Sequence, residues 1–169
     1  MQEALHRLEA LARGEMRVSR LYQTPAFPKG NGPDFVNAVA GIETELSADD
    51  LLSALHDIEA EAGRERNVRW GQRTLDLDLL ALGQAVLPNE HTYLSWRDLP
   101  PDSQMTRAPD QLILPHPRLQ DRAFVLVPLC DIAPDWRHPV FGRTAASLCA
   151  ALPDEDRAEV VPIETDQKA

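Results

Sequence analysis

Two carboxylates separated by a single residue, Asp76 and Asp78, are the strongest candidates for chemistry in this sequence. They lie in the run TLDLDLLAL at residues 74–82, where leucine and aspartate alternate as in a strand with one buried face. Side chains two residues apart on a strand share a face and lie roughly 7 Å apart. That spacing suits a hard cation such as Mg²⁺, which often keeps substrate phosphates among its ligands. A solvated acidic strand without a metal is the alternative interpretation.

Four arginines precede this pair in the loop at residues 64–73. Guanidinium groups bind phosphate oxygens through paired hydrogen bonds and stay charged at any working pH. A basic loop that leads into an acidic pair is the combination that phosphoryl transfer requires, because metal and arginines together neutralise the migrating charge. The sequence contains no G-x-x-x-x-G-K-[ST] run, so a P-loop enzyme is excluded. Ion pairs with neighbouring acids are the alternative for these arginines.

Aromatic and amide side chains elsewhere in the sequence could recognise a flat, polar ring. Trp70, in the arginine loop, either stacks on such a ring or anchors the loop. Asn37 is predicted in mid-strand, where its amide either satisfies backbone groups or reads the edge of a ring. Phe35, with Thr24 and Pro25, could help to form that pocket.

Two further polar side chains are candidates for nucleotide contacts. His116 lies between two prolines and is followed by Arg118 and Arg122, so it could donate a hydrogen bond to a phosphate, although a structural histidine is the alternative. Glu59 lies near the end of a predicted helix, beside the arginine loop. Its carboxylate could accept from a ribose hydroxyl or form an ion pair with an arginine of that loop.

The elements that must position these residues are predicted from apolar periodicity and from turn-forming residues. Amphipathic patterns predict helices at residues 2–13, 47–63 and 144–152, and a partly helical segment at 118–132 that breaks near Pro128. Alternation predicts strands at about 16–23, 34–43 and 74–82. Residues 88–111 are predicted as an irregular surface loop. This mixed order, without regular βαβ spacing, favours an antiparallel α+β sandwich.

Composition limits the possible classes of function. The chain of 169 residues is 43% hydrophobic, enough for a packed core, and contains no run of ~18 apolar residues that could span a membrane. Its formal net charge of −10 disfavours binding to nucleic acid or anionic membranes, because phosphate contacts supply most of that affinity. We therefore expect a protein that acts on small molecules. The first residues, MQEALHR, include no hydrophobic stretch of the signal-peptide type, so we expect a cytoplasmic location. We also expect a monomer, although no sequence feature establishes the oligomeric state.

The sequence also resembles a known family. The run RWGQRTLDLD at residues 69–78, with DFVN at 34–37, LPHPR at 114–118 and RAFVLVPL at 122–129, is similar to 6-hydroxymethyl-7,8-dihydropterin pyrophosphokinases of folate biosynthesis. The similarity covers about residues 2–152. It implies a ferredoxin-like α+β fold with helices packed on an antiparallel sheet. It also implies transfer of the β,γ-pyrophosphoryl group of ATP to the pterin hydroxymethyl group, with release of AMP.

The resemblance assigns roles by position. Two Mg²⁺ ions would be held by Asp76 and Asp78, and Arg64, Arg66 and Arg73 would complete the catalytic set. The residues implied for ATP are Leu52, Glu59, Arg64, Arg66, Arg73, His116 and Arg122. The residues implied for the pterin are Thr24, Pro25, Phe27, Phe35, Asn37, Trp70, Asp76 and Phe124, with Trp70 and Phe124 on the two faces of the ring.

One departure from the family pattern leaves alternatives open. Family members begin with a strand of the type aliphatic-aliphatic-G-[SA]-N, whereas this sequence starts within the first helix. We therefore expect a pyrophosphokinase domain over residues 1–152 without that strand, an irregular insertion at about 88–111, and a polar tail at 153–169. The alternatives are a catalytically impaired remnant that binds pterin or nucleotide, and another Asp-x-Asp transferase that releases ADP or pyrophosphate.

Overall fold

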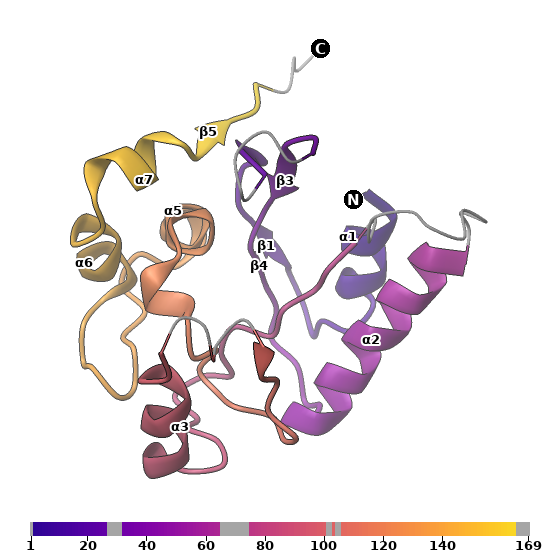
Figure 1. Cartoon of the computed structure of the whole chain (residues 1–169). Coiled ribbons are helices and arrows are strands. Elements are labelled where there is room, and N and C mark those ends of the chain that lie inside the picture. The colour runs from indigo at the N-terminus through magenta and orange to yellow at the C-terminus, as the bar shows by residue number, and fades with distance from the viewer. Residues whose placement is uncertain (1, 27–31, 65–74, 101–102, 104–105, 165–169) are drawn as a thin grey trace. The chain divides into compact units, whose positions relative to one another are not determined.

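The computed structural model describes the chain except for residues 1, 27–31, 65–74, 101–102, 104–105 and 165–169. It combines helices with small antiparallel sheets (Figure 1), which confirms the α+β class. The chain divides into two compact units, residues 1–16 with 42–117 and residues 17–41 with 118–169. The helices are α1 (Gln2–Glu9), α2 (Ala48–Arg64), α3 (Glu90–Arg97), η1 (Leu119–Asp121), α5 (Ala123–Ile132), α6 (Ala145–Ala150) and α7 (Asp154–Ala158). The strands are β1 (Arg17–Val18), β2 (Tyr22–Thr24), β3 (Phe35–Asn37), β4 (Ala40–Gly41) and β5 (Val161–Pro162).

In the first unit, α1 packs beside α2 (Figure 1), and α2 agrees closely with the predicted helix. Ser47 caps it, because its hydroxyl accepts a 3.1 Å hydrogen bond from the amide of Asp50. The apolar face of α2 is buried at Leu51, Leu55 and Ile58. An ion pair between Arg7 and Glu61 joins the exposed sides of the two helices. The helix that carries Glu59 is therefore anchored along its length.

The prediction of an irregular segment at residues 88–111 is wrong for its first part, which forms α3. The side chain of Asn89 accepts from the amide of Thr92 at 2.9 Å and so starts the helix. Tyr93 is fully buried, which supplies the apolar contact that holds the helix in place. A short helix with a single buried aromatic shows little apolar periodicity. The prolines on either side of this helix also favoured the prediction of a loop.

In the second unit, each of the two predicted strands at residues 16–23 and 34–43 is divided in two. β1 pairs with β4, and β2 pairs with β3, both antiparallel. The interruption lies at Ser19, whose hydroxyl accepts from the amide of Val39 at 2.9 Å in place of a backbone carbonyl. Beyond this interruption, Tyr22 and Thr24 are buried on one face of the sheet.

Helix α5 is continuous, so the predicted break near Pro128 is wrong. Pro128 lies inside the helix and is fully buried, and the burial of this apolar helix offsets the lost amide donor. The segment expected as a polar tail forms α7 and β5, and β5 adds a third strand to the sheet by pairing with β2. The core of this unit includes Tyr22, Ala123 and Val160.

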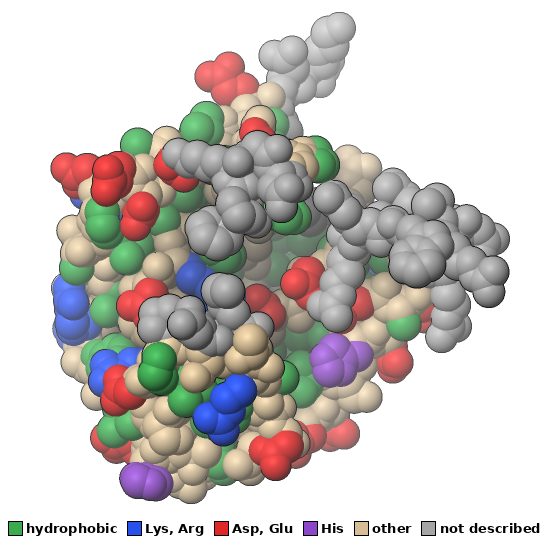
Figure 2. All heavy atoms as spheres, viewed as in Figure 1, with side chains coloured by type: hydrophobic (Ala, Val, Ile, Leu, Met, Phe, Trp, Pro, Cys, Tyr) green, Lys and Arg blue, Asp and Glu red, His purple; other side chains and the backbone are tan. Residues whose placement is uncertain are grey.

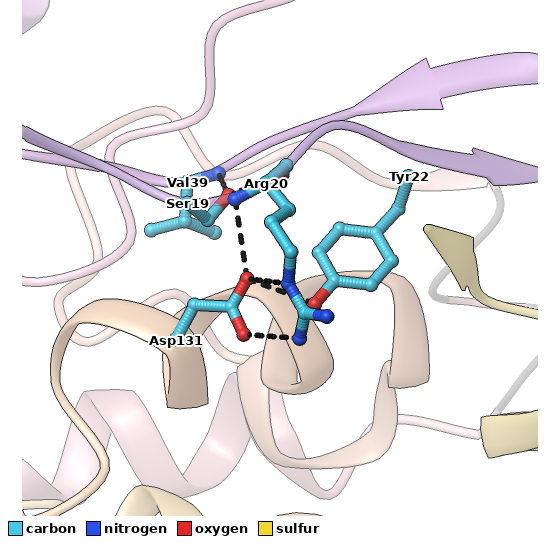
Figure 3. Close-up of polar contacts among 5 residues, drawn as sticks. All are labelled: Ser19, Arg20, Tyr22, Val39 and Asp131. Carbon is cyan, nitrogen blue, oxygen red and sulfur yellow. Dashed lines mark hydrogen bonds and ion pairs between the residues drawn. The ribbon is translucent and has the colours of Figure 1, made fainter. Parts of the chain in front are cut away.

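A carboxylate near the end of α5 connects this helix to the sheet of the same unit (Figure 3). Asp131 accepts hydrogen bonds from the backbone amide of Arg20 at 3.1 Å, from the Arg20 guanidinium at 2.8 and 3.1 Å, and from the Tyr22 hydroxyl at 2.8 Å. The bonds from Arg20, and then the one from Tyr22, hold the pKa of Asp131 below its usual range. Burial, together with the bond to Asp131, raises the pKa of Tyr22 to about 12.

The surface agrees with the acidic composition. Acidic side chains are spread over the face shown in Figure 2 and do not gather in one patch. Within the described part of the chain, none of the helices combines the length and the apolar character needed to cross a membrane.

Candidate active site

The acidic pair lies in the first unit on a segment with the predicted alternation. Asp76 and Asp78 are exposed, whereas Leu75, Leu77 and Leu79 are half-buried. The predicted strand at 74–82 is nevertheless wrong for residues 75–82, which join no ladder among the residues that the structure describes. Alternation sets which side chains point inward, but a strand also needs a hydrogen-bonded neighbour. Both carboxylates are therefore exposed, and the leucines between and beside them are partly covered.

Helix α2 holds this segment through Glu59. The Glu59 Oε1 atom accepts a hydrogen bond of 2.5 Å from the amide of Leu77, the residue between the two aspartates. Leu52 lies seven residues before Glu59, so both residues are on the same side of the helix. Both side chains are half-buried. The two α2 residues implied for ATP thus share one face, and one of them contacts the acidic segment.

The histidine implied for a phosphate lies beside the same segment. The amide of His116 donates to the carbonyl of Leu80 at 2.8 Å, and Leu80 follows Asp78 by two residues. Leu87 and Leu114 also exchange two backbone hydrogen bonds, at 2.9 and 3.1 Å. These bonds keep the stretch that follows the aspartates beside the stretch that leads to His116. Ile113 and Leu114 are buried, and His116 is half-buried. Backbone bonds therefore bring His116 next to the acidic stretch.

The donor set of this segment can be compared with what a metal requires. Within the described residues, there is no group of three or more His, Cys, Asp or Glu side chains that could hold a metal ion. Zinc-type cages need three or four protein ligands, whereas Mg²⁺ is commonly bound by one or two carboxylates with water and substrate phosphates. Two exposed carboxylates fit Mg²⁺ and do not fit a closed structural site.

The second unit brings together part of the set implied for the pterin. In the β2–β3 ladder, Thr24 pairs with Phe35 and Tyr22 pairs with Asn37, so these four side chains share a face. The Asn37 amide donates to the Thr24 hydroxyl at 2.7 Å, which fixes its orientation. Thr24 is buried, Pro25 and Asn37 are half-buried, and Phe35 is 54% exposed. A side-chain partner for Asn37 was not among the sequence-based expectations.

The start of α5 completes this surface. Ala123, the first residue of α5, packs against Tyr22. Phe124 follows it and remains 39% exposed. The guanidinium of Arg122 lies 5.4 Å from the centroid of the Phe124 ring. A cation over an aromatic face can be attractive in water, so this pair is positioned as a unit. An exposed aromatic and an arginine thus lie at the start of the helix that packs against Tyr22, which pairs with Asn37 in the sheet.

Several predicted site residues lie outside the described part of the chain. They are Phe27, Arg66, Trp70 and Arg73, and the side chain of Arg64 also lies outside it. The Asp131 carboxylate, which contacts the start of β2, is not among the predicted residues. No local signal could have found it, because its partners are more than 100 residues away in the chain.

The sequence of this chain matches a known family of proteins. The family model described as 7,8-dihydro-6-hydroxymethylpterin-pyrophosphokinase (HPPK) matches residues 1–134. The chain is 43% identical over 156 residues to the 2-amino-4-hydroxy-6-hydroxymethyldihydropteridine pyrophosphokinase of Pseudomonas aeruginosa, covering 92% of this chain and 83% of that protein.

Two further relatives extend the comparison. The Synechocystis protein with the same name is 38% identical over 149 residues, which cover 88% of this chain and 66% of the relative. The folic acid synthesis protein fol1 of Pneumocystis carinii is 34% identical over 147 residues, or 87% of this chain and 17% of that longer protein. This chain therefore belongs to the 7,8-dihydro-6-hydroxymethylpterin-pyrophosphokinase family.

Proposed function

We propose that this protein transfers the β,γ-pyrophosphoryl group of ATP to the hydroxymethyl group of 6-hydroxymethyl-7,8-dihydropterin, with Mg²⁺, and releases AMP in folate biosynthesis. The observation that carries the proposal is the family match over residues 1–134, which spans every residue assigned to either substrate. As a member of this family, the chain is a pyrophosphokinase that uses ATP as its co-substrate. The proposal includes a ferredoxin-like arrangement and a monomer that acts on small molecules.

In this proposal the triphosphate and metal bind at the acidic segment of the first unit. Asp76 and Asp78 are the metal ligands, and His116 donates a hydrogen bond to a phosphate. Leu52 and Glu59 line the adenosine side, and Arg64, Arg66 and Arg73 take up phosphate charge. The exposure of both aspartates supports this assignment. Mg²⁺ held by these carboxylates would supply positive charge that offsets the negative charge moving during transfer.

The pterin is assigned to residues of the second unit, with Asp76, Phe27 and Trp70 as further contacts. Phe124, which is 39% exposed, is assigned to one face of the ring and Trp70 to the other. Phe35, which is 54% exposed, helps to form the pocket, and Asn37 offers an amide to the polar edge of the ring. Arg122, beside Phe124, is assigned to a phosphate. The hydrogen bond between Asn37 and Thr24 supports this role, because an oriented amide can discriminate between donor and acceptor patterns.

The chemistry of this transfer relies on positioning. No covalent nucleophile is needed, because the pterin hydroxyl itself attacks phosphorus and AMP leaves. The protein must align the hydroxyl with the β-phosphorus and exclude water as a competing acceptor. Its residues then contribute by holding ATP, orienting the pterin and balancing charge. Loss of either set of contacts should therefore reduce turnover.

The proposal is tested by incubating the protein with ATP, Mg²⁺ and 6-hydroxymethyl-7,8-dihydropterin and separating AMP from ADP by chromatography. We expect AMP only when the pterin is present, and none when a chelator removes Mg²⁺. Formation of ADP would contradict pyrophosphoryl transfer and favour a different phosphotransferase. Pterin binding without AMP would instead support the impaired remnant.

A further inference from the structure

Glu59 contacts the backbone between the two aspartates. Its Oε1 atom accepts a 2.5 Å hydrogen bond from the amide of Leu77, and Asp76 and Asp78 flank that residue on either side. We propose that Glu59 is a positioning residue, which sets the location of both carboxylates through the Leu77 amide. This inference rests on the proposed role of the aspartates in binding Mg²⁺.

The Leu77 amide depends on this contact because of where it lies. Within the described residues, the segment at 75–82 joins no strand ladder that would hold its backbone. The backbone bond from His116 reaches Leu80, which is three residues further along the chain. Glu59 is thus a contact to the half of the segment that carries the aspartates, and His116 contacts the other half.

Helix α2 gives Glu59 a rigid base. The neighbouring Ile58 is 6% exposed and Leu55 is 6% exposed, so the helix is anchored directly beneath the contact. A hydrogen bond to a carboxylate is roughly twice as strong as one between neutral groups. Residues that only orient metal ligands typically change metal affinity or activity by about 10- to 100-fold when removed. Glu59 lies on an anchored helix and contacts the backbone between the two aspartates, which is the geometry that such a role requires.

This role differs in a measurable way from a contact with the ribose. A positioning residue alters how much Mg²⁺ the enzyme needs, and its effect is the same for ATP and for its deoxyribose analogues. A ribose ligand instead alters the preference for ATP over 2′-deoxy-ATP and 3′-deoxy-ATP. The two roles use different oxygens of one carboxylate, so each must be measured separately.

The experiment compares Glu59→Ala, Glu59→Gln and a matched control, Asp57→Ala, which removes an exposed carboxylate from the same helix. The first readout is the amide proton resonance and hydrogen exchange of Leu77 in the isotope-labelled protein. The second is the Mg²⁺ concentration that gives half-maximal AMP formation, measured with ATP and with both deoxy analogues. Thermal unfolding verifies that each variant is folded.

In Glu59→Ala we expect the Leu77 amide to shift upfield and exchange faster, and the half-saturating Mg²⁺ concentration to rise about tenfold. Glu59→Gln keeps a neutral acceptor oxygen, so its Mg²⁺ requirement should rise less, and Asp57→Ala should match the wild type. An unchanged Leu77 amide or an unchanged Mg²⁺ requirement in a folded Glu59→Ala protein would overturn the inference. Wild-type protein that forms no AMP would contradict the proposed function instead, and the Leu77 resonance would still decide the positioning role.

Discussion

The amide nitrogen of His116 lies 2.8 Å from the carbonyl oxygen of Leu80, which follows Asp78 by two residues. This bond uses backbone atoms only, so it survives a change of side chain at position 116. The adjacent Leu114 and Pro115 are fully buried and hold the same stretch in place. The imidazole can therefore be removed without displacing the chain that carries it.

Replacement of His116 by alanine tests its proposed phosphate contact. Loss of one hydrogen bond to a charged group is worth about 1.5–3 kcal/mol. We therefore expect kcat/KM for ATP to fall about 10- to 100-fold, while KM for the pterin stays near the wild-type value. Steady-state kinetics with each substrate varied in turn measures this. The control is His91→Ala, an exposed histidine on α3. Equal kinetics for His116→Ala and His91→Ala would refute the contact.

Replacement of Asp78 by alanine tests the metal assignment. Asp78 is exposed, so the fold should tolerate the change. Turnover should fall by more than about 100-fold, because even residues that merely orient metal ligands change activity by about 10- to 100-fold. Calorimetry with Mg²⁺ and a non-hydrolysable ATP analogue should show weakened metal binding. Near-normal rates at low Mg²⁺ would exclude Asp78 as a ligand.

Replacement of Thr24 by valine tests whether the orientation of Asn37 matters for the pterin. Valine preserves the shape of Thr24 but removes the hydroxyl that accepts from the Asn37 amide. We expect KM for the pterin to rise about fivefold, the equivalent of about 1 kcal/mol, with KM for ATP unchanged. Gln23→Ala, on the opposite face of β2, is the control. An effect on ATP alone would place Thr24 outside the pterin site.

Replacement of Tyr22 by phenylalanine tests the contact between the sheet and α5. The lost hydrogen bond to Asp131 should lower the free energy of unfolding by about 1–2 kcal/mol at pH 7. The pKa of Tyr22 is raised from 10.0 to about 12, so the stabilisation is complete below pH 10 and is lost as the pH rises toward 12. Wild type and variant should therefore converge in stability over that range. Urea unfolding measures this difference in the free energy of unfolding. A difference that stays constant from pH 10 to pH 12 would contradict the raised pKa of Tyr22.

The elements that the sequence predicts well are those with complete local signals. α2 has an apolar face, a capping serine and acidic residues in its first turn, and the structure places it within one residue of the prediction. α6 likewise begins after Thr144, whose hydroxyl accepts from the amide of Ser147. By contrast, α3 has one buried aromatic and no continuous apolar face, so periodicity could not reveal it.

The candidate site was predictable in its residue types but not in its supporting contacts. The alternation of leucine and aspartate correctly indicated which side chains at 75–79 face inward. It could not indicate that Glu59 would take up the Leu77 amide, because that bond joins residues 18 positions apart. The contacts of Asp131 with Arg20 and Tyr22 depend on chain folding over still longer separations.

The fate of each phosphate of ATP tests the central claim most directly. The protein is incubated with 6-hydroxymethyl-7,8-dihydropterin, Mg²⁺ and ATP labelled at the β-phosphate in one reaction and at the γ-phosphate in another. The account predicts that both labels appear in the pterin product and that the AMP carries neither. A pterin product labelled only from the γ-phosphate, with labelled ADP from the β-phosphate, would contradict pyrophosphoryl transfer.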